Sequence, residues 1–112
     1  MDPNFWNAFD SLVTENEIVI DRRKGSSHPR FPDLVYPYDY GYLKDTTSAD
    51  GGGIDVWQVG EPKKVTGIIV TVDCLKKDSE IKILLGATKK EANEILQFHN
   101  RGDMQALLIL RK

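Results

Sequence analysis

The sequence has little of what several classes of protein need. It contains one cysteine, Cys74, so no disulfide can form within the chain and a domain held together by internal disulfides is excluded. Its two histidines, His28 and His99, are far apart and lack cysteine neighbours, which argues against a zinc site. No apolar run approaches the ~20 residues of a membrane span, and no basic stretch before an apolar run marks a signal peptide. We therefore expect a cytoplasmic protein with no membrane partner.

An excess of positive charge is also missing. The formal net charge is −2 and the isoelectric point about 5.6, so the chain has no overall basic field and we expect no nucleic-acid partner. An anionic substrate would need a local basic pocket or a bound metal ion. The 112 residues, 40% of them hydrophobic and 29% charged, suit one globular domain, which we place at residues 1–112.

Periodicity predicts two helices and several short strands. One helix is expected over residues 2–16, where Asp2 can cap and Pro3 suits the first helical position. The other is expected over residues 87–100, where Thr88 and Glu91 form a capping box. Strands are predicted for these segments: 17–21, 54–59, 65–75, 80–86 and 104–112. The pattern indicates a mainly β, α+β fold, in the form of a small OB-like closed β-barrel with one or two helices packed outside.

Carboxylates gather at the ends of the predicted strands. Asp21 ends the first strand, and Asp50 and Asp55 bracket a loop of three glycines. Asp73 and Glu80 lie on either side of the hairpin turn at 76–79. Mg²⁺ prefers oxygen ligands and takes only a few carboxylates from the protein, so convergence of these residues at one barrel mouth would make a magnesium site. The alternative is that they are ordinary turn residues.

Basic and aromatic residues are interleaved with these carboxylates. Arg30 lies among other basic residues in the loop at 22–32, and Lys82 lies on the strand at 80–86. Phosphate oxygens favour the guanidinium fork of arginine and the ammonium of lysine, and a tyrosine hydroxyl can also donate to them. Four tyrosines crowd residues 33–43, a partly extended segment that Pro37 and Gly41 make irregular. A solvated basic loop and tyrosines that only pack the barrel are the alternatives.

The order of these motifs resembles the soluble family I inorganic pyrophosphatases. That family carries a Y-P-x-x-Y-G-Y segment, a D-G-D-P-x-D loop, a strand ending in aspartate and a D-x-K strand. The chain has "YPYDYGY" at 36–42, "DGGGID" at 50–55, "GIIVTVD" at 67–73 and "EIK" at 80–82. A G-S-x-H-P loop at 25–29 is similar to that of a short, compact branch of the family. The resemblance covers roughly residues 17–100.

The resemblance implies a substrate, a cofactor and site residues. The substrate would be inorganic diphosphate or another phosphoanhydride, the cofactor Mg²⁺ with Mn²⁺ as a substitute, and the assembly a homo-oligomer. Five carboxylates occupy positions of metal ligands or of residues near the metals: Asp50, Asp55, Asp73, Asp21 and Glu80. Three residues occupy positions that bind phosphate or line the pocket: Arg30, Lys82 and Tyr36. Tyr40, near the attacking water, and Asp55 would act in catalysis.

The chain also departs from the family pattern. Gly52 replaces the middle aspartate, a metal ligand that helps to activate water, and Gly53 replaces the proline. A hairpin with a phosphate-binding arginine is absent, and Arg101 is only a weak match to a late Tyr-Lys pair. Three readings follow: a Mg²⁺-dependent diphosphatase of reduced activity, a weakened or inactive phosphate-ligand-binding module, or a protein that kept only the fold. In the second reading, the N–H groups of residues 51–53 would form an anion nest.

Overall fold

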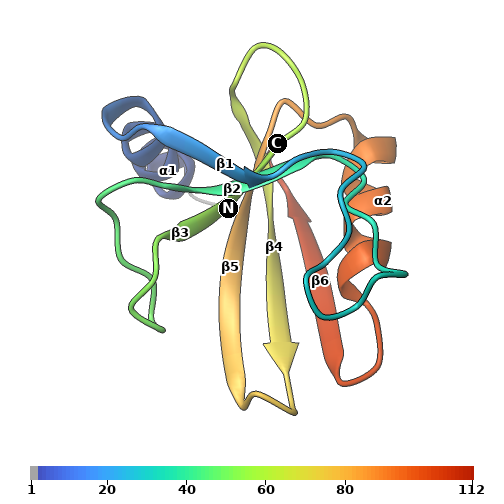
Figure 1. Ribbon diagram of the computed structural model, residues 1–112. Helices are drawn as coiled ribbons and strands as arrows, with labels where there is room; N and C mark the ends of the chain where they lie inside the picture. The colour runs from blue at the N-terminus through green and yellow to red at the C-terminus, as the bar shows by residue number, and fades with distance from the viewer. Residues whose placement is uncertain (1–2) are drawn as a thin grey trace.

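The computed structural model describes residues 3–112, which form six strands and two helices (Figure 1). In chain order the elements are α1 (Pro3–Glu15), β1 (Ile18–Arg22), β2 (Asp39–Leu43), β3 (Ile54–Gln58), β4 (Val65–Asp73), β5 (Asp78–Leu85), α2 (Lys89–His99) and β6 (Met104–Leu110). The predicted helices and strands are confirmed with shifts of a few residues, and the aromatic segment supplies β2. The predicted cap at Asp2 lies outside the described residues. Neither of these helices is long and apolar enough to cross a membrane.

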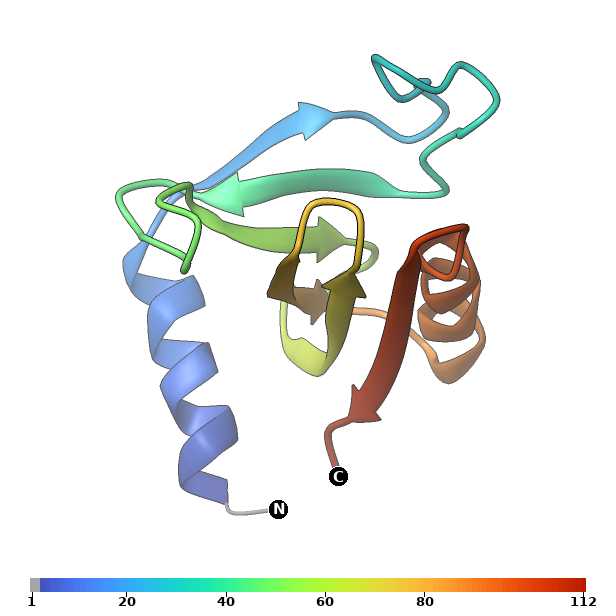
Figure 2. The ribbon, with the colours of Figure 1, turned by 90° about the horizontal axis from the view of Figure 1, so that it is seen from below.

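The strands form one sheet in the order β1-β2-β3-β5-β4-β6. Every neighbouring pair is antiparallel except β3 and β5, which run parallel. Figure 2 shows the sheet curling around, but over residues 3–112 no backbone pairing joins β1 to β6. The α+β fold class is therefore confirmed, whereas the predicted hydrogen-bonded closure of the barrel is not.

Side-chain contacts take the place of closure at the open edge. The loop at 23–38, which follows β1, contacts α2. The Tyr38 hydroxyl donates to the Glu94 carboxylate at 3.2 Å, and the rings of Tyr36 and Phe98 lie 5.0 Å apart. The edge of β1 is thus linked through this loop to the helix that packs beside β6.

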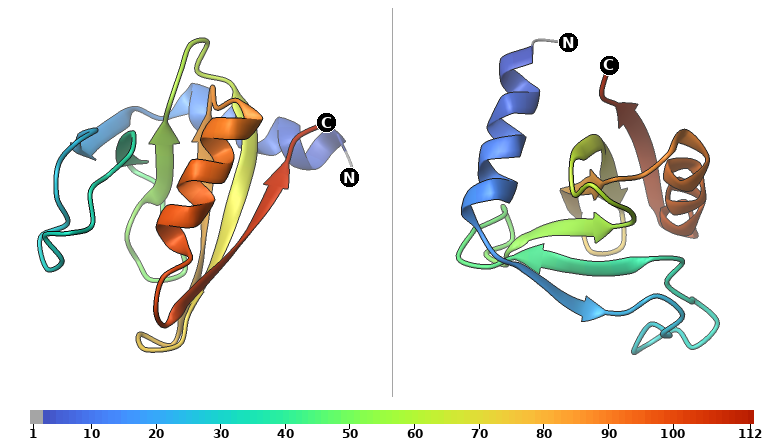
Figure 3. Two further views of the ribbon diagram at one scale, coloured as in Figure 1. Left: turned by 90° about the vertical axis from the view of Figure 1, so that its right-hand side faces the viewer. Right: turned by 90° about the horizontal axis from the view of Figure 1, so that it is seen from above.

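The central strands are buried on both faces. Successive residues such as Val56 and Trp57, or Ile83 and Leu84, belong to two different hydrophobic clusters. Successive side chains of a strand point to opposite faces of the sheet. A strand that is covered on both faces therefore has apolar residues at consecutive positions, and the segment 65–75 shows this pattern. Figure 3 shows why both faces are covered, with α1 and α2 on opposite sides of the sheet.

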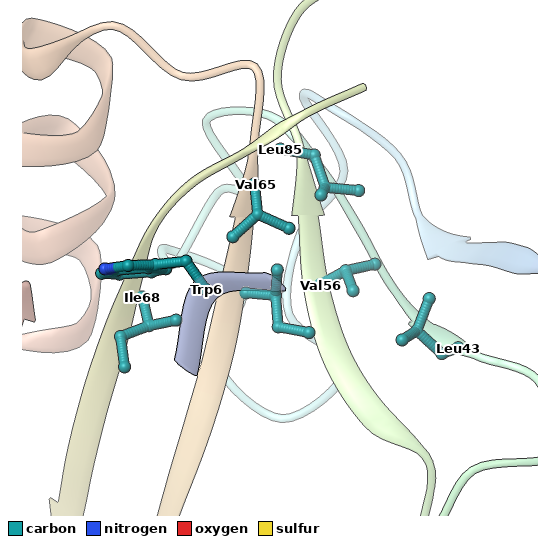
Figure 4. Packing of buried hydrophobic residues seen from close by; sticks show 7 residues of the cluster. Trp6, Leu43, Val56, Val65, Ile68 and Leu85 are labelled. Carbon is teal, nitrogen blue, oxygen red and sulfur yellow. The ribbon is translucent and has the colours of Figure 1, made fainter. Parts of the chain in front are cut away.

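The face toward α1 is an apolar core. Its buried members are Trp6, Leu43, Val56, Val65, Ile68, Ile83 and Leu85 (Figure 4). Trp6 is the buried side chain of α1 and is 3% exposed. The Arg111 guanidinium lies over its ring, 5.9 Å from the centroid, and makes a bidentate ion pair with Asp10 at 2.8 and 2.9 Å. These contacts hold α1 against the sheet.

The opposite face mixes aromatic and polar residues. Its buried cluster comprises Tyr36, Trp57, Ile69, Leu84, Ala87, Ala92 and Ile95. Helix α2 packs here, and the predicted capping box of Thr88 and Glu91 is present at its start. Three polar side chains are also buried: Thr71, Lys82 and His99. A buried polar group needs a hydrogen-bond partner. Lys82 and His99, whose partners are described below, both line a cleft at one end of this face.

A carboxylate and lysine cleft as the candidate active site

A cleft of about 1030 Å³ opens at one end of the sheet, and residues from four connections line it. In Figures 1 and 2 these are the 23–38 loop, the 44–53 loop, the β4–β5 turn and the α2–β6 turn. Eight of the nine predicted site residues line it: Arg30, Tyr36, Tyr40, Asp50, Asp55, Asp73, Glu80 and Lys82. The ninth, Asp21, is exposed at the irregularity in β1 between Ile20 and Arg22 and is not among the lining residues.

Lys82 lies at the centre of the polar part of the cleft. Its side chain is 5% exposed, and its ammonium donates three hydrogen bonds: to Asp55 at 2.7 Å, Glu80 at 2.7 Å and Tyr40 at 2.9 Å. The parallel pairing of β3 with β5 creates this arrangement, because it sets Asp55 directly beside Lys82. All three donors of the ammonium are used.

The charge of Lys82 is fixed by these partners. Burial alone would lower the pKa of the ammonium, but the negative charges and hydrogen bonds of its partners outweigh burial and raise the pKa. Tyr40 becomes charged when it loses its proton, so burial raises the pKa of its hydroxyl well above the usual value. At neutral pH Lys82 is therefore a cation, and Tyr40 keeps its proton and is a hydrogen-bond donor rather than a base.

The cleft is short of positive charge. Burial raises the pKa of Glu80 even though its Oε2 bonds Lys82, and interactions with Asp50 and Asp55 raise it further. Asp55 and Glu80 thus share one buried ammonium, and Asp50 interacts with Glu80. Such a cluster is electrostatically unfavourable unless a further cation joins it.

The glycine loop is held by its own hydrogen bonds. The Asp50 carboxylate accepts the Ser48 hydroxyl and the Gly52 N–H, which lower its pKa well below the usual range and keep it ionised. The Gly51 N–H donates to the Ser48 carbonyl at 3.0 Å, and Gly51 has a φ of +88°, which favours glycine. Two of the N–H groups of the predicted anion nest therefore donate within the loop, and this structure does not support the nest.

Asp73 has a structural role that the sequence did not reveal. Its Oδ1 accepts the N–H groups of Leu75 and Lys76, each at 3.0 Å, and so caps the β4–β5 turn. It still faces the cleft. Among residues 3–112, no group of three or more histidine, cysteine or acidic side chains is already arranged as a metal site.

His99 lines the cleft but was not among the site residues predicted from the sequence. Its Nε2 accepts the indole N–H of Trp57 at 3.1 Å, and the histidine is 6% exposed. Burial, helped by the charge of Lys82, lowers the pKa of His99 to about 3, so the ring is neutral. The sequence does contain a sign that His99 is buried, because its spacing from Ala92 and Ile95 places all three residues on one face of the helix.

The outer part of the cleft is aromatic. The ring of His28 lies parallel to that of Tyr36 at 6.3 Å and contacts Phe31 at 5.1 Å. The backbone N–H of Arg30 donates to His28 Nδ1 at 3.0 Å, which fixes the turn between them. Burial and the nearby charges of Arg22 and Arg30 lower the pKa of His28, so this ring too is neutral at pH 7.

The family assignment comes from comparison with known proteins. Residues 13–101 match the family model described as inorganic pyrophosphatase. The chain belongs to the inorganic pyrophosphatase family. This agrees with the resemblance in its motifs, although no curated protein sequence is significantly similar to this pyrophosphatase-family chain.

Solved structures share the fold. An inorganic pyrophosphatase from Coxiella burnetii has 15% identity and a TM-score of 0.63, covering 83% of this chain and 82% of its own. One from Neisseria gonorrhoeae has 18% identity and a TM-score of 0.59, with coverage of 79% and 77%. One from Helicobacter pylori has 14% identity and a TM-score of 0.59, with coverage of 83% and 81%. The pyrophosphatase architecture is therefore retained at low sequence identity.

Proposed function

We propose that this chain is a metal-dependent inorganic diphosphatase, which hydrolyses diphosphate to two phosphates. The observation that carries the proposal is a group of three carboxylates on the lining of one cleft, which Arg30 also lines. Asp55 and Glu80 share the buried ammonium of Lys82, and Asp50 interacts with Glu80. This combination offers oxygen ligands for a cation and cationic donors for phosphate at the same place.

The donor set fits Mg²⁺, with Mn²⁺ as a substitute. The carboxylates are hard oxygen ligands, and their charge exceeds that of Lys82, so a divalent cation would relieve their repulsion. Asp50, Asp55 and Glu80 are the residues that would hold it, with Asp73 facing the same cleft and Asp21 outside it. When bound, the cation supplies an activated water and neutralises phosphate charge.

The protein's own groups bind and orient the substrate. Arg30 is exposed on the cleft lining and can hold a phosphate oxygen directly. Lys82 is protonated, and it would hold a second phosphate oxygen in exchange for one of its three present hydrogen bonds, once a cation has taken over a carboxylate. Tyr40 keeps its hydroxyl proton and can donate it to a phosphate oxygen. Tyr36, 6% exposed, supports the rings of Tyr40 and His28. Their contribution is positioning and charge stabilisation.

Reduced activity is part of the proposal because Gly52 brings no carboxylate. The alternative is a catalytically weakened or inactive module that binds a phosphate ligand. With the glycine N–H groups engaged within their loop, such a module would bind through Lys82 and Arg30. A cytoplasmic location and a single domain over residues 1–112 complete the proposal.

A homo-oligomer is also proposed. Val70 pairs with Ile81 on one side and Leu107 on the other, which sets three apolar side chains in a row across β5, β4 and β6. Ile81 is 43% exposed and Leu107 63%, so a second copy would cover apolar surface here.

Phosphate release tests the proposed activity. The purified protein is supplied with diphosphate and Mg²⁺ or Mn²⁺, beside an Asp55→Asn variant that keeps the shape of the side chain. We expect metal-dependent turnover that falls ~10²–10³-fold in the variant. If turnover does not exceed that of Asp55→Asn, the enzyme proposal is rejected. Calorimetric titration with diphosphate then separates the binding module from a protein that kept only the fold.

A further inference from the structure

The cleft is larger and more aromatic than inorganic diphosphate requires. Its volume of about 1030 Å³ is at the upper end of the ~300–1,000 Å³ typical of sites for drug-sized organic ligands. Around Lys82 it is lined by Asp55 and Glu80. The remaining lining includes Phe31, Leu34, Leu75, Phe98 and Met104.

A continuous run of rings joins the polar and apolar parts. The Tyr40 hydroxyl bonds Lys82, and the Tyr40 ring lies 5.5 Å from Tyr36. Tyr36 in turn lies 6.3 Å from His28 with the ring planes within 8°, and His28 contacts Phe31. A ligand that extends outward from Lys82 therefore passes along a row of aromatic side chains that ends at the exposed ring of Phe31.

The outermost side chains of the cleft are exposed to an unusual degree. Phe31 is 59% exposed and Leu75, on the β4–β5 turn, is 76% exposed. Both line the same cleft, although large apolar side chains on a free surface are usually scattered singly. A ligand seated between them would remove this apolar area from water.

From this arrangement we infer that the cleft accepts a nucleoside diphosphate as well as inorganic diphosphate, with the phosphates of the nucleotide near Lys82 and Arg30 and its base stacked on Phe31. This inference rests on the proposed hydrolase function and names the substrate class. Charged groups beside the apolar lining, including Asp33, Arg101 and Asp103, suit the polar edges of a base and oppose a hydrocarbon tail.

The reaction follows the same bond chemistry as diphosphate hydrolysis. The oxygen of water forms a bond to the terminal phosphorus, and the bond from that phosphorus to the bridging oxygen breaks. The bridging oxygen keeps the electron pair and leaves with the nucleoside monophosphate. One proton of the water is released to solvent, and the products are the monophosphate and inorganic phosphate.

Two non-hydrolysable analogues test the inference by calorimetry with Mg²⁺ present: α,β-methylene-ADP and methylenediphosphonate. Base stacking on an aromatic side chain contributes ~1–3 kcal/mol, so we expect the nucleotide analogue to bind on the order of 10-fold more tightly. Phe31→Ala should bring the ratio of the two affinities close to one. Val35→Ala is the matched control, because Val35 is an exposed apolar residue of the same loop that does not line this cleft. It lines a second groove, together with Pro37 and Gln97.

Equal affinities in the unmodified protein, or a ratio that Phe31→Ala leaves intact, would overturn the inference. So would tighter binding of a prenyl diphosphate than of the nucleotide. Phosphate release distinguishes this failure from failure of the proposed function. Hydrolysis of inorganic diphosphate without any preference for the nucleotide rejects only the inference, whereas no hydrolysis and no binding of methylenediphosphonate rejects the proposed function as well.

Discussion

The side chains of β3, β4 and β5 point alternately to two faces, and the two faces differ in content. Toward α1 the buried cluster is apolar throughout, as Val56, Ile68 and Ile83 illustrate. Toward the cleft, the strands place Trp57 and Ile69 beside buried polar groups, Lys82 and Thr71. In each of these three strands, alternate residues therefore pack the apolar core, and the residues between them contribute to the face that holds the cleft.

The difference matters because the two faces depend on different forces. Apolar burial is non-directional and scales with area, so the α1 face contributes stability in proportion to the surface that it covers. On the cleft face, Lys82 depends on three short hydrogen bonds to partners on three strands. Substitutions on the two faces should therefore produce separable effects on stability and on activity.

The largest expected effect on the apolar face follows Trp6→Ala. Removing a buried tryptophan costs ~3–5 kcal/mol of unfolding free energy, through lost burial and the cavity that remains. Urea unfolding measures this loss, and turnover per folded molecule should stay near that of the unmodified protein. A fall in turnover as steep as that of Asp55→Asn would show that the faces are not separable. If Trp6→Ala does not fold, the same comparison of stability and turnover can be made with Val65→Ala, which is a smaller change in the same cluster.

On the cleft face, Lys82→Met should destabilise by about 3 kcal/mol, because it leaves Asp55 and Glu80 without their shared cation. The methionine roughly keeps the volume, so the loss is mainly electrostatic. Mg²⁺ should therefore raise the stability of this variant more than that of the unmodified protein. Urea unfolding with and without Mg²⁺ measures both the stability that the variant loses and the stability that Mg²⁺ restores. Equal stabilisation of the two proteins by Mg²⁺ would contradict a cation site at these carboxylates.

The pH dependence of stability should also come from the cleft face. The unfolded chain protonates His99 near its ordinary pKa of 6.5, whereas the folded chain does so only near pH 3. Its contribution to stability is therefore complete above pH 6.5 and is lost as the pH falls toward 3, by up to about 1.4 kcal/mol for each pH unit.

Comparison with His99→Gln isolates this effect, because glutamine keeps an acceptor for the Trp57 N–H but does not titrate. Urea unfolding at pH 7, 6, 5 and 4 should show a smaller decline in the variant. Parallel declines in the two proteins would mean that His99 is not the group responsible.

The smallest expected effect lies in the glycine loop. A Cβ at Gly52 would approach Asp50 Oδ1 at 3.3 Å, which a small shift of that carboxylate relieves. Gly52→Asp should raise Mg²⁺ affinity roughly 10-fold, since a further unit charge near an exposed cation contributes on the order of 1–2 kcal/mol. Calorimetry measures the affinity, and an unchanged or lower value would show that the loop does not have the family's geometry.

Gly53→Ala is the contrasting variant in the same loop. A Cβ there would lie 2.8 Å from the Tyr42 ring and 3.0 Å from the Leu43 carbonyl, so this substitution should destabilise the protein without raising Mg²⁺ affinity.

Local patterns predicted the elements well, and the reasons are physical. The β-branched run at 65–75, the alternation at 80–86 and the capping box at Thr88 each contain their signal within a few residues. The aromatic segment was harder to interpret, because Pro37 breaks the pattern just before β2 begins at Asp39. Closure of the barrel could not be predicted in this way, since it depends on pairing between β1 and β6.

The site shows the same limit. Motif order placed Asp50, Asp55 and Lys82 in one cleft, yet the direct contact of Asp55 with Lys82 depends on the parallel register of β3 and β5, which no local pattern encodes. Asp73 looked like a metal ligand, and its capping of the following turn appears only in the structure.

The ion pair between Asp10 and Arg111 joins residues 101 positions apart in the chain. Helix α1 buries Trp6 against Val65 and Ile68 of β4, and Arg111 follows β6 directly. The helix therefore has little to dock on until the last strand has paired with β4, and such distant contacts form late because loop closure must precede them. In kinetic terms, substitutions at this junction should accelerate unfolding while leaving the refolding rate nearly unchanged.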